Sequence, residues 1–292
     1  MENSYSRKLH LWEGWSQAVL RDPSPGSPAG PSDPAEFAQR LYLCESLEPA
    51  PPPRTEEGVE PYTLQWFLDI ENQRHGGRGR WIPRLLEFAK HSGETLLGLG
   101  DGLGTDWLQY ARHGAAVIVC SPSAEQLALI RRNFELRGLT GRFLHAGPSA
   151  LPLESASIDV ACVSSLLQGV SDPAAMVEEI YRVLKPGGKV LAVAPARYDV
   201  DFWLRLCFPW RRWLPRMRPA VEPRVGYTAR GLRRLFTRFI ERRVYKRHLR
   251  RSEVPHLWRW LPLPFLERLF GHILVLKAFK PLSAAITVRA AA

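Results

Sequence analysis

Four glycines occupy alternate positions, Gly98, Gly100, Gly102 and Gly104, in a stretch that reads TLLGLGDGLGTDW from residue 95. They directly follow a short apolar run and directly precede a helical pattern. Because glycine has no Cβ, a turn built from it allows the backbone to lie close against a bound molecule. The spacing therefore predicts a ligand-binding loop between a strand and a helix.

Two well-known glycine loops do not fit this spacing. The dinucleotide fingerprint GxGxxG needs a third glycine where this chain has Leu103 or Thr105, depending on the register. A phosphate-binding loop needs Gly-Lys followed by Ser or Thr, which the stretch lacks. The pattern that remains is GxGxG.

The segments around the loop indicate the fold class. Two helices are expected before the loop, over residues 61–75 and 79–93, and strands and helices then alternate to residue 196. Ser123 is the expected N-cap of one helix, and Pro186 with the two glycines after it is expected to end another. This alternation predicts an α/β fold with a doubly wound parallel sheet. Ligands of such sheets bind at the carboxyl ends of the strands.

From these motifs, residues 60–281 resemble a class I S-adenosylmethionine-dependent methyltransferase of the type 11 group. The resemblance rests on the GxGxG loop, on VIVCSPSAEQLALIRRN, on AGPSALPLESASIDVACVSS and, most specifically, on EEIYRVLKPGGKVLAVAP. Residues 227–239, 240–249 and 272–280 resemble the last helix and the final antiparallel strands. The resemblance implies a mainly parallel, seven-stranded, Rossmann-like sheet whose last strand is antiparallel. It also implies S-adenosyl-L-methionine as the cofactor.

In that family, one acidic side chain ends the first strand, a second ends the second strand and binds both ribose hydroxyls of the cofactor, and a third follows the third strand and accepts from the adenine amino group. These three positions correspond here to Gly98, Cys120 and Gly147. None of the three is acidic, so we expect compensation from Asp101 in the loop and from hydroxyl and backbone groups such as Ser121. Asp101 is equally compatible with a solvent-facing role, and Cys120 with a buried packing role. The cofactor site predicted from the resemblance comprises Gly98, Gly100, Asp101, Gly102, Gly104, Cys120, Ser121, Gly147, Pro148, Ser149 and Ser164.

No catalytic residue is assigned from the sequence. Methyl transfer from a sulfonium is an in-line displacement that positioning and water exclusion can promote without an obligatory acid or base. Where relatives often have two histidines, this chain has Gln168 and Gly169. A lone histidine or tyrosine is more often a packed or surface residue, but four are candidates for the pocket: Tyr62, His75, His145 and Tyr198.

Composition predicts the domain organisation. Nine of the thirty-one residues from Pro23 to Pro53 are proline, which predicts a flexible extension over residues 1–56. A methyltransferase-like domain is expected over 57–281, with N-terminal helices at 57–92 and a basic, aromatic cap insert at 197–226; a tail follows at 282–292. Four widely spaced cysteines without a CxxC pair indicate neither a disulfide framework nor a metal site.

The net charge of +11 is concentrated in one segment, because residues 197–259 contain 18 Arg or Lys and 5 Asp or Glu. Over 202–218, aromatic residues alternate with arginines, which is typical of contact with an anionic membrane surface. Two other interpretations stay open: the tryptophans close a pocket for a small-molecule acceptor, or the charges form a solvated face. Nucleic acid is not favoured, since no RNA-binding module is recognisable.

The remaining expectations concern location and function. No apolar run reaches the roughly 20 residues of a membrane span, and the N-terminal residues lack a secretory pattern, so we expect a cytoplasmic protein with possible peripheral membrane contact. The sequence predicts a methyltransferase that acts on a small or lipophilic acceptor. The alternative is a binding or scaffold protein that keeps the fold and has lost the cofactor. The sequence gives no oligomeric state.

Overall fold

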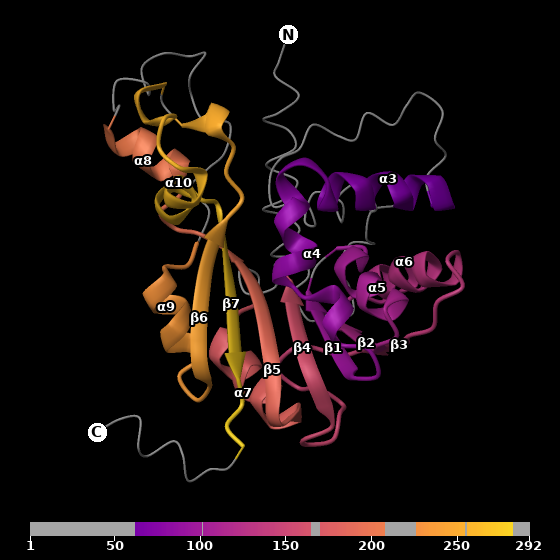
Figure 1. The fold of residues 1–292 in the computed structure, drawn as a ribbon. Helices are drawn as coiled ribbons and strands as arrows, with labels where there is room; N and C mark the ends of the chain where they lie inside the picture. The colour runs from indigo at the N-terminus through magenta and orange to yellow at the C-terminus, as the bar shows by residue number, and fades with distance from the viewer. Residues whose placement is uncertain (1–61, 101, 165–169, 208–225, 255, 283–292) are drawn as a thin grey trace, which may run out of the picture.

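The computed structural model describes residues 62–100, 102–164, 170–207, 226–254 and 256–282 (Figure 1). A seven-stranded sheet of order β3-β2-β1-β4-β5-β7-β6 forms its centre. The strands are β1 (Thr95–Gly100), β2 (Ala116–Ser121), β3 (Arg142–His145), β4 (Ile158–Ser164), β5 (Leu184–Pro195), β6 (Ile240–Arg247) and β7 (Ile273–Phe279). The first five strands are parallel, and β7 is antiparallel to both β5 and β6. The predicted fold class is confirmed.

The predicted extension over 1–56 and most of the cap insert lie outside the described residues, as does the tail beyond residue 282. The helices of the described part are α3 (Leu64–His75), α4 (Ile82–Leu85), α5 (Thr105–Arg112), α6 (Ala124–Glu135), α7 (Pro173–Val183), α8 (Val200–Cys207), α9 (Ala229–Leu235) and α10 (Leu263–Phe270). Within the described ranges, no helix is long and apolar enough to cross a bilayer.

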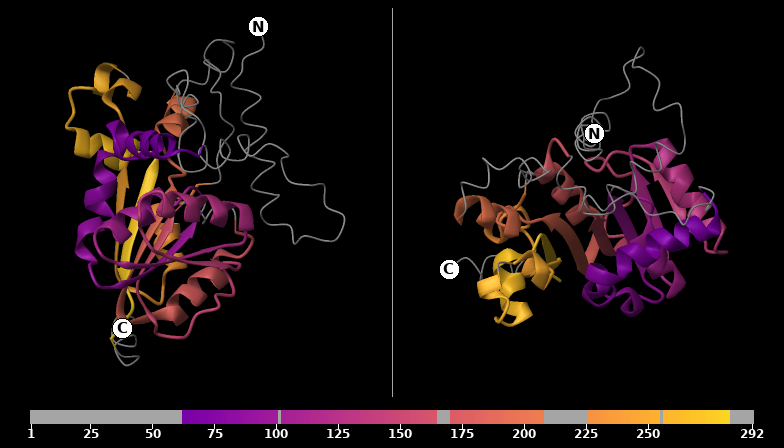
Figure 2. Two further views of the ribbon diagram at one scale, coloured as in Figure 1. Left: turned by 90° about the vertical axis from the view of Figure 1, so that its right-hand side faces the viewer. Right: turned by 90° about the horizontal axis from the view of Figure 1, so that it is seen from above.

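Alternating side chains of the strands build two hydrophobic cores, one on each face of the sheet. In β1, Leu97 and Leu99 face the core formed with α7 and α9, whereas Leu96 faces the core formed with α4, α5 and α6. Figures 1 and 2 show that helices lie on both faces of the sheet. Near-continuous apolar strands are what a sheet covered on both faces requires. Gly98 therefore points to the same side as Leu96, toward α5.

One predicted helix ends earlier than expected. The sequence predicted a helix that continues to the Lys-Pro-Gly-Gly turn, but α7 ends at Val183 and β5 begins at Leu184. Lys280 explains the difference, because its Nζ donates to the carbonyls of Tyr181 and Leu184, each over 2.7 Å, and so satisfies the end of the helix. Ser123, in contrast, is confirmed as the N-cap of α6, since its hydroxyl accepts from the backbone N–H of Gln126.

The second expected N-terminal helix, over 79–93, is broken into short turns. A 3-10 turn precedes α4, and another follows Glu87, whose φ of 60° is left-handed and interrupts the helical backbone. The Glu87 carboxylate accepts from Lys189 Nζ at 2.7 Å and from Lys277 Nζ at 2.9 Å. These two lysines lie on β5 and β7, so the ion pairs fix the break in the helix against these neighbouring strands.

We predict that Glu87→Gln lowers the free energy of unfolding at neutral pH by about 1–2 kcal/mol. Burial of the Glu87 carboxyl opposes ionisation, but Lys189 and Lys277 lower its pKa from 4.5 to about 2. The stabilisation is therefore complete above the ordinary pKa and is lost as the pH falls from there toward about 2. Urea unfolding across this pH range measures the effect. Exposed Glu154→Gln is the control, and equal pH profiles for the two variants would contradict the prediction.

Candidate cofactor-binding site

The glycine loop follows β1 at the carboxyl edge of the sheet, as predicted. Gly100, Gly102 and Gly104 have φ values of 154°, 115° and 73°, which other residues rarely adopt. A Cβ on Gly100 would lie 2.0 Å from the carbonyl oxygen of Ser164, and one on Gly104 would lie 2.7 Å from Ile130. The loop thus needs glycine in order to pass closely between β4 and α6.

Gln126, a residue of α6, holds the loop through hydrogen bonds to its backbone. Its Nε2 donates to the carbonyls of Gly100 and Gly102 over 3.2 and 2.9 Å. Its Oε1 accepts from the Ser121 hydroxyl, and the Ser121 oxygen in turn accepts from Ser123 N–H over 3.1 Å. Gln126 and Ser121 are both buried. Ser121, which we expected among the groups that compensate for the missing acids, therefore uses its hydroxyl proton within the protein.

The three positions without an acid differ in their surroundings. A Cβ on Gly98 would lie 2.6 Å from the Trp107 indole, so the ring occupies the space that an acidic side chain would need. Cys120 belongs to a hydrophobic core, and burial raises the pKa of its thiol to about 11, which agrees with the packing interpretation. Gly147 is exposed, and nothing lies within 4 Å of the position of its Cβ.

The remaining predicted site residues lie at two places. Ser164 ends β4 beside Gly100, its partner in the sheet register. Pro148 and Ser149 follow Gly147 beyond the end of β3, where Ser149 is exposed. Asp101 lies outside the described residues. The structure thus places Ser164 beside the glycine loop. Residues 147–149 follow β3, two strands away from β1, and the side-chain position of Gly147 is open.

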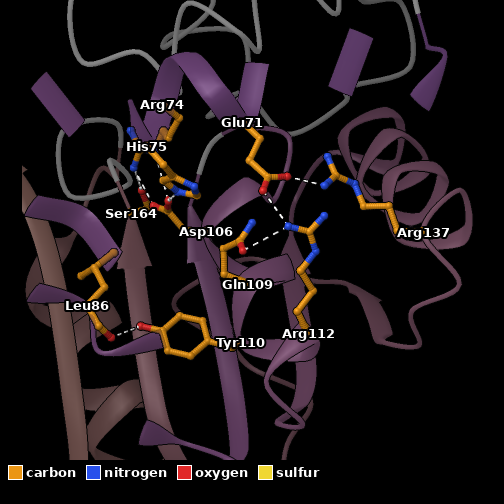
Figure 3. Close-up of polar contacts among 10 residues, drawn as sticks. All are labelled: Glu71, Arg74, His75, Leu86, Asp106, Gln109, Tyr110, Arg112, Arg137 and Ser164. Carbon is orange, nitrogen blue, oxygen red and sulfur yellow. Dashed lines mark hydrogen bonds and ion pairs between the residues drawn. The ribbon is translucent and has the colours of Figure 1, made fainter. Parts of the chain in front are cut away.

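A buried ion pair that the sequence did not indicate lies next to the loop (Figure 3). Arg74 of α3 donates to both carboxylate oxygens of Asp106 in the first turn of α5, over 2.6 and 3.2 Å. His75 Nε2 lies 2.9 Å from the same carboxylate, and Arg74 also reaches Ser164 Oγ at 3.4 Å. Burial alone would raise the pKa of Asp106, but Arg74 and His75 hold it well below its usual range.

A second group of charged residues holds helix α3 against α5 and the end of α6. Glu71 of α3 accepts from Arg112 of α5 over 2.7 Å and from Arg137, which follows α6 (Figure 3). Arg112 also donates to Gln109 over 3.3 Å. Burial opposes ionisation of Glu71, yet Arg137 and Arg112 lower its pKa. Helix α3 is therefore held by ion pairs to α5, through Arg74 and Glu71, and to the end of α6, through Glu71.

Of the four candidate pocket residues, His75 lies at the loop, where it contacts Asp106. His145 Nε2 lies 2.7 Å from the Pro122 carbonyl oxygen, and Tyr62 packs with its ring 5.5 Å from that of Trp66. The fourth, Tyr198, is exposed beside α8. Gln168 and Gly169 lie outside the described residues. Of the four candidates, therefore, only His75 is found beside the glycine loop in the described part of the chain.

Comparisons with known proteins agree with this geometry. Residues 96–192 match a family model described as a methyltransferase domain. A demethylmenaquinone methyltransferase of Thermus thermophilus is 32% identical over 117 residues, which cover 39% of this chain and 53% of the relative. A ubiquinone biosynthesis O-methyltransferase of Methylocella silvestris is 26% identical over 206 residues, which cover 64% and 78%. The chain spans about half the length of the first curated relatives it matches.

Among solved structures, a SAM-dependent methyltransferase from Aquifex aeolicus has a TM-score of 0.52 with 14% identity, over 74% of this chain and 97% of its own. That likeness shows the fold. Together, the strand order and the GxGxG loop agree with the family match: the chain has the fold of a class I methyltransferase and is similar over residues 96–192 to the type 11 methyltransferase family. S-adenosylmethionine, expected from the sequence, is the cofactor of this family.

We predict that Asp106→Asn destabilises the protein by about 3–5 kcal/mol, because it removes a charged partner of the buried Arg74 guanidinium. The double variant Arg74→Met with Asp106→Asn is expected to lose less than the sum of the single variants, since neither charge is then left alone. Chemical unfolding of the unchanged protein, Asp106→Asn, Arg74→Met and the double variant measures the coupling free energy between the two side chains. Additive losses would show that the two side chains do not interact.

A second prediction concerns the Gly98 position. Gly98→Ala is expected to lower the free energy of unfolding by about 1–3 kcal/mol, because the new methyl group overlaps the Trp107 indole. Gly147→Ala is the matched control, since its methyl group would enter open space. Thermal unfolding compares the two, and an unchanged midpoint for Gly98→Ala would mean that the ring does not fill this space.

Proposed function

We propose that this protein is an S-adenosylmethionine-dependent methyltransferase that acts on a small or lipophilic acceptor. The observation that carries the proposal is the conformation of the glycine loop. Gly100, Gly102 and Gly104 have positive φ at the carboxyl end of β1, and Gln126 holds the loop within the segment that matches the methyltransferase model. This edge is where parallel α/β sheets bind their ligands.

Two features of the described residues support binding of the cofactor. Residues 98–100 and 102–104 carry no side chain larger than leucine, and both Leu99 and Leu103 are fully buried. The segment from Gly147 is exposed and open for an adenine ring. At the ribose position, the neutral Cys120 replaces a carboxylate, so we expect weaker binding than in relatives that have the acid. When bound, the cofactor supplies a methyl group on a sulfonium.

The charges beside the loop suit a cationic ligand. Arg74 alone would repel a sulfonium, but Asp106 neutralises it at 2.6 Å, and both side chains are nearly inaccessible to water. The protein's contribution to methyl transfer is then to hold the loop rigid, to exclude water with α3 and to orient the acceptor. Such a role agrees with the absence of an assigned acid or base among the described residues.

The names of the curated relatives favour an acceptor class within this proposal. Two of them are named for demethylmenaquinone and for ubiquinone biosynthesis, and both of these names contain a quinone. We extend to this chain the coarser class, a lipophilic quinone-related acceptor. The alternative of a cofactor-free scaffold protein has no support from the comparisons.

Calorimetric titration of the full chain with S-adenosylmethionine and with its demethylated product tests cofactor binding. We expect dissociation constants in the micromolar range for both, with transfer of labelled methyl to a naphthoquinol or catechol in a separate assay. Absent or millimolar binding would refute the proposed function. Binding without transfer to either class of ring would refute the proposed acceptor and leave the cofactor site in place.

Restoring the missing ribose carboxylate gives a gain-of-function test. Cys120→Asp is expected to tighten binding of both nucleosides by about ten- to a hundredfold, because a hydrogen bond to a charged group contributes about 1.5–3 kcal/mol. Arg142, whose charge acts on this position, favours the ionised form. Cys120→Asn, which is neutral and of the same shape, is the control. Equal affinities for the two variants would show that Cys120 does not lie at the ribose.

A further inference from the structure

Exposed apolar side chains gather at one end of the molecule. Eight large hydrophobic residues are exposed among those that the structure describes, and six of them lie in or next to α8 and α10. Trp260 is 78% exposed, Leu206 61% and Phe265 50%. We call this set the α8–α10 face: Tyr198, Phe202, Leu206, Trp260, Phe265 and Leu269. An exposed cluster of this size calls for a partner.

Both helices also have a buried side, which shows that the exposed residues are not an unfinished core. Val200 of α8 packs with Leu266 and Phe270 of α10 in a separate small core, and the Trp203 ring lies 6.4 Å from that of Phe270. On the outer side of α10, Phe265 and Leu269 are spaced by four residues, and so are Phe202 and Leu206 on α8. Each helix is therefore apolar on two sides.

The outer residues of the two helices are connected. The Tyr198 and Phe202 rings are 4.8 Å apart between centroids. Lys246 Nζ donates both to the Tyr198 carbonyl and to the Leu269 carbonyl, the latter over 2.6 Å, so the backbone before α8 lies beside the end of α10. The two helices lie side by side at the carboxyl edge of the sheet (Figures 1 and 2). These contacts show that the two helices, and the exposed apolar side chains that they carry, lie at the same end of the molecule.

Cations border this face. The Arg197 guanidinium lies 5.9 Å from the centre of the Tyr198 ring, and Arg197 is itself exposed. Arg268 is exposed on α10, between Phe265 and Leu269 in the sequence, and Arg250 and Arg251 are exposed before Trp260. The face therefore combines aromatic side chains with guanidinium groups.

The nearby described carboxylates are used within the protein. Asp199 lies 3.2 Å from Nδ1 of His272, and Glu253 lies 3.7 Å from Nε2 of the same ring. Glu267 of α10 pairs with Arg247 at 3.4 Å. These acids are paired with His272 and Arg247, whereas Arg197 and Arg268 are exposed, so the described charges favour an anionic partner.

We propose that the α8–α10 face binds the surface of an anionic phospholipid bilayer, with the apolar side chains in the headgroup boundary and the arginines on lipid phosphates. Tryptophan, phenylalanine and leucine on one side of a helix, next to arginines, are the composition of interfacial segments. Each basic residue near such a surface adds attraction to anionic lipids. This inference is independent of the methyltransferase activity. It extends the membrane contact expected over 202–218 to α10, while residues 208–218 lie outside the described part.

Sedimentation of the full chain with vesicles of phosphatidylcholine, alone or mixed with phosphatidylglycerol, tests the inference. We expect binding to the mixed vesicles that weakens with added salt, and much weaker binding to phosphatidylcholine alone. The double variant Trp260→Ser with Leu269→Ser is expected to bind at least about tenfold more weakly. The control is Leu64→Ser with Leu282→Ser, which removes side chains of matching exposure, 41% and 75% against 41% and 78%, from other parts of the surface.

The role of the arginines is tested with the double variant Arg197→Glu with Arg268→Glu, which is expected to abolish the preference for vesicles that contain phosphatidylglycerol. Thermal unfolding verifies that each variant is folded. Equal vesicle binding by the Trp260/Leu269 variant and the control pair would overturn the inference. So would a concentration-dependent dimer that the Trp260/Leu269 variant dissociates while no form binds vesicles, because a second copy of the chain would then cover the face. Binding to single-stranded RNA in place of vesicles would overturn it as well.

Discussion

The carboxylate of Asp106 is the group on which the arrangement of the site depends. It is buried in the first turn of α5, where an unpaired charge would be too costly to keep. Arg74 and His75 meet that requirement from the end of α3, and Arg74 also reaches Ser164 on β4. An N-terminal helix, the helix after the glycine loop and a central strand are thereby joined through one carboxylate. Helix α3 consequently lies over the edge of the sheet at which a ligand is expected.

The surroundings of the strand ends show why the domain does not need acids there. Trp107 fills the space at Gly98, and the neutral Cys120 is part of a hydrophobic core, so neither position requires a partner charge. Asp106 is an acid beside the loop, but its carboxylate is already paired with the Arg74 guanidinium. The glycine loop is therefore positioned by neutral contacts, chiefly the two hydrogen bonds from Gln126 to its carbonyls. A cofactor held there would depend more on the backbone than it does in relatives that have the acids.

Local signals predicted much of the fold, and long-range contacts account for what was missed. Alternating apolar runs and the Ser123 cap act within a few residues, and the parallel sheet and α6 follow from them. The break at Glu87 depends on Lys189 and Lys277, which are about 100 and 190 residues away, and no helical periodicity contains that information. The early end of α7 depends in the same way on Lys280.

The site shows the same division. The GxGxG spacing located the loop, whereas Gln126 looked like an ordinary polar residue of an amphipathic helix, and Arg74 and Asp106 are 32 residues apart.

His272 connects three segments at the end of the sheet edge that carries α8 and α10. Burial would lower the pKa of this imidazole, but Asp199 and Glu253 raise it to about 9, so the ring stays protonated and binds the chain before α8 to the start of β7. Because β1 and β5 are parallel, the glycine loop and α8 leave the sheet at the same edge. A bilayer bound at the α8–α10 face would therefore lie on the side of the domain where the loop opens. A lipophilic acceptor dissolved in that bilayer would approach the loop along the molecule, without first having to partition into water.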